Sequence, residues 1–289
     1  MARIVNACLR DGRGGSPTAI VEDADPAALS EAQRRRIPVL HGTSHAVFVT
    51  TTADESIVDL RFFTAGGELP ACGHGTVAAI AFLADRAGGD AHEFTLRASG
   101  RTFTGRAVRE GRHVHAAFDP GPVTLSEPSP AGVRLVLDAL GAGTDRLAEG
   151  VRVASIGRPR MLVPLISPHA VAALAPDLDR LRAACDRLGL LGCYVHSAPV
   201  AGGRLVARMF APSIGVPEDI ANANSTACLA AHLAGRGISG ISVDMGDALS
   251  HPATITASAS PGPHGPEVLV GGVACRVVDV SAQAGGAAP

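Results

Sequence analysis

The stretch Cys72-Gly-His-Gly-Thr-Val-Ala-Ala-Ile-Ala-Phe-Leu83 joins a glycine-rich turn to an almost wholly apolar segment. About half a chain later, Asn222-Ala-Asn-Ser-Thr-Ala-Cys-Leu-Ala-Ala-His-Leu233 repeats this pattern. A helix on the protein surface is apolar along one stripe only, whereas these two segments are apolar on nearly every side. Each segment therefore predicts a helix that is enclosed by its own sheet.

The residues that precede these segments are also repeated. The segment Arg61-Phe-Phe-Thr-Ala-Gly-Gly-Glu-Leu-Pro70 resembles Arg208-Met-Phe-Ala-Pro-Ser-Ile-Gly-Val-Pro217, and both run from strand-like residues into turn residues. The parallel extends back to Pro17–Val21 and Arg160–Pro164, each followed by a helix-like segment. Such repeats indicate a structure built in units. We predict an α+β protein with two pseudo-symmetric halves, each a β-barrel-like sheet wrapped around a central helix.

The predicted halves are almost equal in size, but the first is discontinuous in the sequence of 289 residues. The N-terminal half is expected to cover residues 1–119 and to take up a C-terminal strand from about residues 265–289. The C-terminal half is expected to cover residues 120–264. The stretch from Pro120 to Pro130 is rich in proline and serine and is the best candidate for the linker.

The composition is that of a folded globular protein, with 46% hydrophobic and 18% charged residues. The chain contains no lysine, so all 25 of its cationic side chains are arginine. This excludes a lysine Schiff base, a pyridoxal-phosphate lysine and a Walker A loop. The net charge of −2, with arginines scattered among acids, provides no field that would attract nucleic acid.

The location of the protein is predicted from its apolar segments and its cysteines. The longest apolar stretch, around Val77 to Ala84, is too short to span a bilayer, so we expect no membrane partner. The N-terminus lacks the apolar core of a signal peptide. The six cysteines form no CxxC pair and are interpreted as reduced thiols. These features predict a cytoplasmic protein.

The starts of the two predicted helices suggest an anion site. Thr76, and one of Asn224, Ser225 or Thr226, are the residue types that cap helix N-termini. A helix start offers unpaired N–H groups and a partial positive charge. Two such starts that face each other across a pseudo-twofold axis would bind a carboxylate, so we expect a small carboxylate substrate.

Groups that transfer protons occur at the same two turns. Cys72 and His74 lie in the first turn, and Glu218 and Asp219 lie in the second. A carboxylate held by backbone dipoles acidifies the adjacent C–H, and a base on one face with an acid on the other can then move that proton. This is racemase or isomerase chemistry. In the alternative interpretation, Cys72 is only a small buried residue and the two acids belong to a solvated loop.

The pattern Glu68-Leu-Pro-Ala-Cys-Gly-His-Gly-Thr76, together with Arg208–Pro212 and Pro217–Asp219, resembles the PhzF-like phenazine-biosynthesis isomerases over nearly the whole chain. The resemblance implies the diaminopimelate-epimerase-like fold, an enzyme that needs neither metal nor organic cofactor, and a homodimer. It also implies a proton and double-bond shift in a small unsaturated carboxylic acid of specialised metabolism, including antibiotic biosynthesis. The implied substrate is similar to dihydrohydroxyanthranilate or to an alkylproline precursor.

The site residues follow from the same resemblance, taken position by position. Gly73 and His74 match the family's histidine-containing turn, and Asp219 matches the acid of its second turn. Where the family typically has Ser-Glu, this chain has Ser44-His45, and Asn222–Thr226 replaces the usual Thr-Gly-Ser turn. With an ordinary pKa of about 6.5, His45 either replaces the glutamate as proton carrier or only lines the pocket. The predicted catalytic residues are His45, Asp219, His74 and Cys72, and the predicted substrate-binding residues are Ser44, Gly73, Gly75, Thr76, Asn222, Asn224, Ser225 and Thr226.

Two other functions and one other site stay open. Cys72 also suggests an amino-acid racemase or epimerase, but its repeat partner is Asn222 or thereabouts, and Cys228 lies deeper in its helix as a structural thiol. A two-thiol racemase is therefore disfavoured. Loss of the family's glutamate also leaves a non-catalytic carboxylate-binding protein possible. His113 and His115 have a spacing that suits zinc, but they lack a third ligand nearby and are predicted to lie on the surface.

Overall fold

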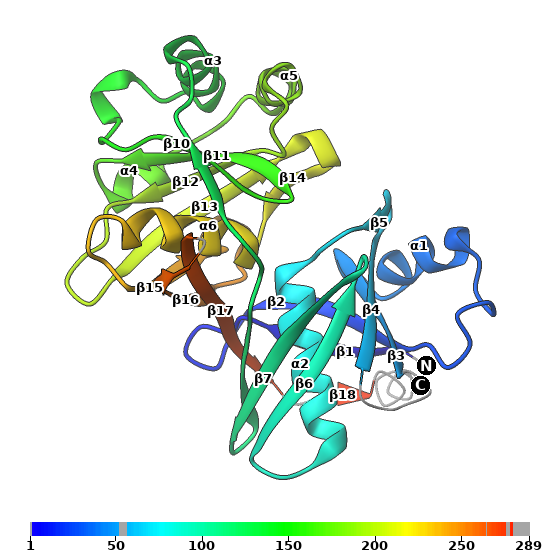
Figure 1. The fold of residues 1–289 in the computed structure, drawn as a ribbon. Coiled ribbons are helices and arrows are strands. Elements are labelled where there is room, and N and C mark those ends of the chain that lie inside the picture. Colours follow the sequence, from blue (N-terminus) through cyan, green and yellow to red (C-terminus); the bar gives the residue numbers. More distant parts are fainter. Residues whose placement is uncertain (1, 52–56, 264, 276–277, 280–289) are drawn as a thin grey trace, which may run out of the picture. The chain divides into compact units, whose positions relative to one another are not determined.

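The computed structural model describes residues 2–51, 57–263, 265–275 and 278–279, which form two compact units (Figure 1). The described residues of the first unit lie within Met1–Asp119 and Gly271–Pro289, and those of the second lie within Pro120–Val270. The later boundary falls inside the strand Gly265–Cys275 rather than at its start. Of the C-terminal strand expected in the first half, residues 276–277 and 280–289 lie outside the described residues.

Strands and helices alternate in a similar order in both units. The first unit contains β1 (Ala2–Ala7), β2 (Ser16–Glu22), α1 (Glu31–Leu40), β3 (His45–Thr51), β4 (Ile57–Thr64), β5 (Gly67–Leu69), α2 (Gly73–Ala87), β6 (Ala91–Ala98), β7 (Arg101–Glu110), β8 (His113–Phe118), the end of β17 (Gly265–Cys275) and β18 (Val278–Asp279). The second unit contains β9 (Thr124–Ser126), α3 (Pro130–Leu140), η1 (Thr144–Arg146), β10 (Arg152–Ile156), β11 (Arg158–Leu165), α4 (Pro168–Ala172), α5 (Leu178–Leu188), β12 (Cys193–Ser197), β13 (Arg204–Ala211), η2 (Pro212–Ile214), β14 (Val216–Asp219), α6 (Ala223–Ala234), β15 (Gly240–Met245), η3 (Asp247–Leu249), β16 (Ala253–Gly262) and the start of β17.

The strand pairing shows that the two units share one plan. β1 pairs antiparallel with β2, β2 parallel with β3, β3 antiparallel with β4, and β4 parallel with β6. The series β10, β11, β12, β13 and β15 repeats these four pairings in the same order and sense. A parallel pair needs a crossover connection, which α1 and α2 provide in the first unit and α4, α5 and α6 in the second. The repeated α+β plan expected from the sequence is confirmed.

The two apolar segments form the central helices, as predicted. Residues 73–84 of α2 are all buried, and α2 contacts β1, β2, β3, β7 and β8. In α6 all residues from Ser225 to Leu233 are buried, and the helix packs against β10, β15 and β16. Gly105 of β7 allows a close approach, because a Cβ there would lie 2.7 Å from a methyl group of Leu96 and 2.9 Å from one of Ile80. Each sheet therefore encloses its helix on several sides.

The predicted helix caps are wrong by about one turn. The N-cap of α2 is Cys72 and that of α6 is Asn222, so Thr76 and Thr226 lie inside their helices. The hydroxyl of Thr76 donates to the carbonyl of Cys72 at 2.9 Å, and that of Thr226 donates to the carbonyl of Asn222 at 3.1 Å. A threonine hydroxyl can bond to the carbonyl four residues earlier instead of capping a helix. Asn224 and Ser225 are likewise first-turn residues rather than caps.

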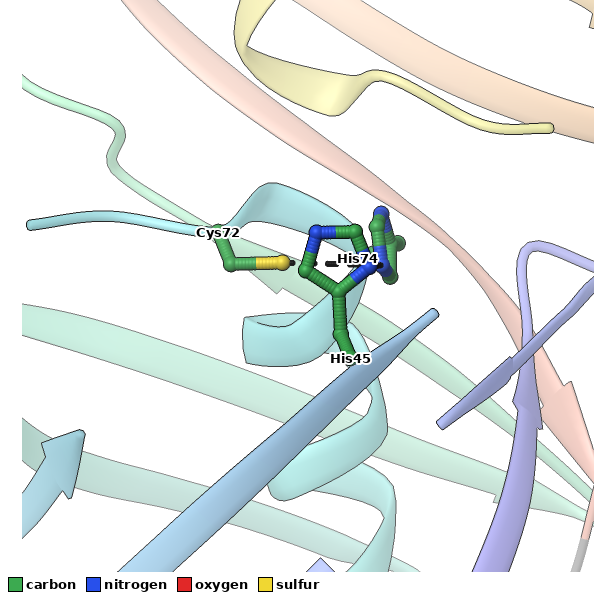
Figure 2. Close-up of side chains that lie close together, drawn as sticks. All are labelled: His45, Cys72 and His74. Atoms are coloured by element: carbon green, nitrogen blue, oxygen red, sulfur yellow. Dashed lines mark hydrogen bonds between the residues drawn. The ribbon is translucent and has the colours of Figure 1, made fainter. Parts of the chain in front are cut away.

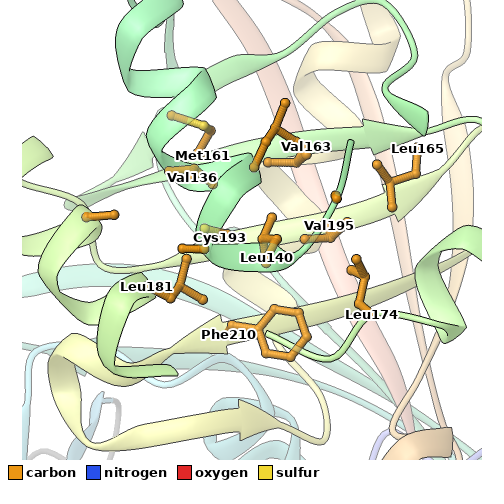
Figure 3. Close-up of a cluster of buried hydrophobic side chains, with 14 of the residues drawn as sticks. Val136, Leu140, Met161, Val163, Leu165, Leu174, Leu181, Cys193, Val195 and Phe210 are labelled. Atoms are coloured by element: carbon orange, nitrogen blue, oxygen red, sulfur yellow. The ribbon is translucent and has the colours of Figure 1, made fainter. Parts of the chain in front are cut away.

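A second layer of helices covers the sheet of the second unit (Figure 3). Leu140 of α3 and Leu181 of α5 are completely buried, together with Val195 of β12 and Phe210 of β13. Fully burying a side chain of this size contributes about 1.5–3 kcal/mol to the free energy of unfolding. The helices α3 and α5, which also contact each other, therefore fix the strands that lead into β14 and α6.

An arginine–glutamate pair is repeated with the fold. Arg61 of β4 donates to Glu68 of β5 through two hydrogen bonds of 2.7 and 2.6 Å. Arg208 of β13 donates in the same way to Glu218 of β14, at 2.9 and 2.7 Å. The side chains of the first pair are each 36% exposed, whereas those of Arg208 and Glu218 are only 13% and 10% exposed. Glu218 thus holds a strand pair together through Arg208, although the sequence suggested proton transfer.

The difference in burial predicts different energies for the two pairs. We expect Glu218→Gln to lower the free energy of unfolding by about 2–3 kcal/mol, because it leaves a largely buried guanidinium without its counter-charge. The matched change Glu68→Gln should cost less than about 1 kcal/mol, because water solvates both partners there. Urea unfolding at pH 7 measures both values. Equal losses for the two variants would show that burial does not decide the strength of the pair.

His196 of β12 predicts how stability depends on pH. Burial lowers its pKa to about 4, with smaller contributions from the nearby charges of His232 and Arg236. In the unfolded chain His196 binds a proton as the pH falls through about 6.5, whereas in the folded chain it stays neutral down to about pH 4. The folded state therefore has its full stability above pH 6.5 and loses stability as the pH falls toward 4. Between pH 7 and pH 5, His196 should lower the free energy of unfolding by about 2 kcal/mol. Comparing urea unfolding of the wild type and His196→Asn isolates this contribution, and an equal pH dependence for both would contradict it.

Candidate active site

Three of the four predicted catalytic side chains lie together in the first unit (Figure 2). His45 is the first residue of β3, Cys72 is the N-cap of α2, and His74 lies in the first turn of that helix. His74 Nε2 is 3.1 Å from His45 Nδ1 and 3.5 Å from Cys72 Sγ. The two imidazole rings meet edge to face, with centroids 4.4 Å apart. We call these three residues the His45 cluster.

The local fold explains why these residues meet. His45 starts β3, which runs parallel to β2 and antiparallel to β4. The first turn of α2 packs directly on these strands at Gly75, where a Cβ would lie 3.1 Å from both Val47 and Phe62. The same Cβ would lie 3.0 Å from Cys72 Sγ. Glycine at position 75 therefore allows the helix start, and with it His74, to approach the start of β3.

The surroundings of the His45 cluster keep His45 neutral. His45, Cys72 and His74 are all buried. Burial lowers the pKa of His45 well below its usual value, and the nearby His74 lowers it further. In the hydrogen bond between the two rings, one of the facing nitrogens donates its N–H and the other accepts it. His45 Nδ1 also contacts Ser44 Oγ at 2.8 Å, so Ser44, a predicted substrate-binding residue, takes part in the same hydrogen-bond network.

Asp219 belongs to a separate group in the second unit. It ends β14 and is buried, and Asn222 Nδ2 donates to its carboxylate at 2.9 Å. Asn222 Oδ1 in turn accepts from the backbone N–H of Ser225 at 2.9 Å. Asn222 thus orients Asp219 while it caps α6. Asn222 is the N-cap of α6 as Cys72 is of α2, which confirms that the two residues are repeat partners.

Sequence reasoning missed two buried residues of this unit. Tyr194, the only tyrosine in the chain, hydrogen-bonds through its hydroxyl to Thr226 Oγ1 at 2.8 Å. Burial raises the pKa of Tyr194, and the charge of Asp219 adds to this effect. Arg160 is also buried and donates to Cys228 Sγ at 3.3 Å. The single tyrosine could have been noticed, but no signal in the sequence marks Arg160 as buried.

The remaining predicted binding residues occupy the two helix starts. Gly73, Gly75 and Thr76 are buried in the first turns of α2, and Cys72 caps this helix without a side-chain hydrogen bond. Ser225 and Thr226 are buried in α6, and Asn224 is partly exposed. The first turns of the two helices contain no acidic residue. The N–H groups of the α2 start are therefore suited to an anionic ligand.

Comparison with known proteins identifies the family of this chain. The family model for phenazine biosynthesis-like protein (PhzC-PhzF) matches residues 5–280. The chain is 31% identical over 231 residues to trans-2,3-dihydro-3-hydroxyanthranilate isomerase of Pseudomonas fluorescens. This match covers 77% of this chain and 76% of that protein. It is 29% identical over 247 residues to the uncharacterized isomerase YddE of Salmonella typhimurium. This match covers 81% of this chain and 79% of that protein.

Solved structures show the same fold. A PhzF-family phenazine biosynthesis protein of Bacillus anthracis has a TM-score of 0.81 at 17% identity, covering 96% of this chain and 98% of that one. The chain therefore belongs to the phenazine biosynthesis-like family, with the diaminopimelate-epimerase-like fold, and it is an enzyme of the isomerase class. No helix in the described part of the chain combines the length and apolar character that a membrane span requires.

Proposed function

We propose that this isomerase shifts a proton and a double bond in a small unsaturated carboxylic acid. The observation that carries the proposal is the 3.1 Å contact between His45 Nδ1 and His74 Nε2. A neutral imidazole is a proton carrier that works near physiological pH. Two imidazoles that share a proton at the start of a buried helix supply both a base and a route for the proton.

The hydrogen bonds of His45 suggest which atom meets the substrate. Its Nδ1 contacts His74 and Ser44, whereas Nε2 has no hydrogen-bonding partner within the described ranges. When Nδ1 carries the shared proton, Nε2 presents a lone pair and acts as a base. His45 Nε2 first takes a proton from the substrate. His45 Nδ1 then passes the shared proton to His74 Nε2, so the His45 ring stays uncharged. Cys72 Sγ, 3.5 Å from His74 Nε2, extends the same route.

The substrate carboxylate is proposed to bind N–H groups at the start of α2, and Asp219 is proposed as a second proton carrier. Binding of the carboxylate by backbone dipoles stabilises the negative charge that develops when the adjacent C–H is deprotonated. Asp219 is held by Asn222 and can return a proton to another carbon of the conjugated system.

The substrate class is proposed from the relatives' names. Relatives from three Pseudomonas species are named trans-2,3-dihydro-3-hydroxyanthranilate isomerase. We propose that this chain acts on that compound or on a related unsaturated acid such as an alkylproline precursor. A two-thiol racemase is not supported, because the helix cap that corresponds to Cys72 is Asn222, whose amide does not transfer protons.

An assay with a defined panel of acids tests the proposal. Purified enzyme is incubated with trans-2,3-dihydro-3-hydroxyanthranilate, with unsaturated alkylproline precursors and with common L-amino acids, and reactions are followed by ultraviolet absorbance and proton NMR. The proposal expects a double-bond shift in at least one unsaturated acid. Loss of optical rotation of an amino acid, with solvent deuterium at Cα, would instead identify a racemase. Saturable binding of the acids without chemical change would identify a non-catalytic binding protein.

A further inference from the structure

The His45 cluster contains the donor atoms of a transition-metal site. One ring nitrogen of His45, one ring nitrogen of His74 and Cys72 Sγ all lie within 4.8 Å of one another, and all three residues are buried. Two imidazoles and one thiolate are borderline-soft ligands that suit Zn²⁺. We infer that these three side chains bind one Zn²⁺ ion and leave its fourth coordination position open. This inference goes beyond the proposed function and does not depend on it.

The distances between the donor atoms agree with tetrahedral zinc. Bonds of about 2.0–2.1 Å to nitrogen and 2.3 Å to sulfur place two nitrogens about 3.3 Å apart, and a nitrogen and a sulfur about 3.6 Å apart. The observed separations from His74 Nε2 are 3.1 Å to His45 Nδ1 and 3.5 Å to Cys72 Sγ. Two of the three ligand separations therefore already match, and the third, between His45 and Cys72, is at most 4.8 Å.

Zinc binding changes the protonation of the cluster in a defined way. His45 Nδ1 and His74 Nε2 both turn a lone pair to the ion, so the proton between them moves to another ring nitrogen through solvent. The S–H bond of Cys72 breaks, its proton is released to water, and the thiolate binds the ion. Two Zn–N bonds and one Zn–S bond form, and no atom is oxidised or reduced.

His45 distinguishes this three-ligand site from the other histidine pair of the chain. Cys72 and His74 alone provide two ligands, and His45 adds the third. His113 and His115 on β8 also lie two residues apart, but none of the three-residue clusters found in the described part of the chain contains them. The positive field at the start of α2 opposes a cation, but it lowers the affinity by less than about sixfold. The same field favours the thiolate form of Cys72, which is the form that binds zinc.

Zinc bound to His45 Nδ1 would leave the proton of this ring on Nε2, so the Nε2 lone pair that the proposed isomerase reaction uses would be lost. Only this consequence rests on the proposed function. The test therefore measures binding, so that failure of one proposal is distinguishable from failure of the other.

Cobalt substitution tests the site directly. The full chain is treated with EDTA, kept reduced without oxygen, and titrated with Co²⁺ and then with competing Zn²⁺. We expect one Co²⁺ per chain, visible d–d bands of a tetrahedral site, and a near-ultraviolet thiolate-to-cobalt charge-transfer band that Zn²⁺ abolishes. His45→Ala and His74→Ala should each weaken binding on the order of 100-fold or more, since loss of a supporting partner alone costs 10–100-fold. Cys72→Ser should remove the charge-transfer band.

Matched variants control for adventitious binding. The double variant His113→Ala, His115→Ala and the variant Cys275→Ser, which changes the one described cysteine that is not buried, should bind as the wild type does. A wild type without the charge-transfer band at saturating Co²⁺ would overturn the inference. A band that survives in Cys72→Ser, or that disappears in the control variants, would also overturn it. If Cys72→Ser does not fold, X-ray absorption of the zinc-bound wild type decides, because the inference requires two nitrogen ligands and one sulfur ligand.

Discussion

His45→Ala is expected to lower kcat/KM for the double-bond shift on the order of 10²–10⁴-fold, which is the usual contribution of a general acid or base. The alanine removes both the nitrogen that meets the substrate and the partner that shares a proton with His74 at 3.1 Å. Steady-state kinetics on the acid identified in the panel assay measure the effect. Circular dichroism and urea unfolding establish that the variant is folded.

Two further variants separate proton transfer from a role in shaping the site. His45→Glu restores the family's typical residue, which can also carry a proton, and should keep activity within about tenfold of the wild type. His115→Ala removes an exposed histidine that pairs with Glu110 and should have no effect. Wild-type turnover by His45→Ala would remove His45 from the mechanism and leave it as a pocket residue.

Asp219→Asn is expected to reduce kcat by a similar factor, on the order of 10²–10⁴-fold, with a smaller change in KM. The asparagine oxygen can still accept the hydrogen bond from Asn222 Nδ2, so the start of α6 should stay intact. What the variant loses is the ability to exchange a proton. Glu218→Gln serves as the matched control, because Glu218 is bound to Arg208 and should affect stability far more than kcat.

Combining the two catalytic variants tests whether both residues act in one turnover. Residues that act as a unit have grossly non-additive effects. We therefore expect the double variant His45→Ala, Asp219→Asn to be scarcely slower than the slower single variant. Losses that multiply would show that the two residues contribute independently, and an Asp219→Asn enzyme with wild-type kcat would exclude this carboxylate as a carrier.

The repeated fold could be predicted from the sequence because its signal is local and occurs twice. The apolar segments after Cys72 and Asn222 are surrounded by protein in both units, and the arginine–glutamate pairs follow the same repeat. The helix caps could not be placed by residue preference. Threonine is a favoured cap, yet Thr76 lies inside α2 and bonds to the carbonyl of the actual cap, Cys72, one turn earlier.

The composition of the candidate site was predictable, but its contacts were not. His45, His74 and Cys72 were singled out by type and by family resemblance, whereas their meeting depends on the pairing of β2 with β3 and on the close packing at Gly75. Burial also changes roles that residue type suggests. Glu218 is a carboxylate in the predicted turn, but it is bound to Arg208, and Arg160 is an arginine that lies inside the protein.

The deuterium content of the product tests most directly the central claim, that the His45 cluster and Asp219 exchange protons with the substrate. Trans-2,3-dihydro-3-hydroxyanthranilate, or the acid that the panel identifies, is converted in deuterated water, and the product is examined by NMR and mass spectrometry. Two carriers that equilibrate with solvent between turnovers predict one deuterium at the carbon that receives the proton. A product formed at the same rate with the substrate's own hydrogen at that carbon would contradict the account.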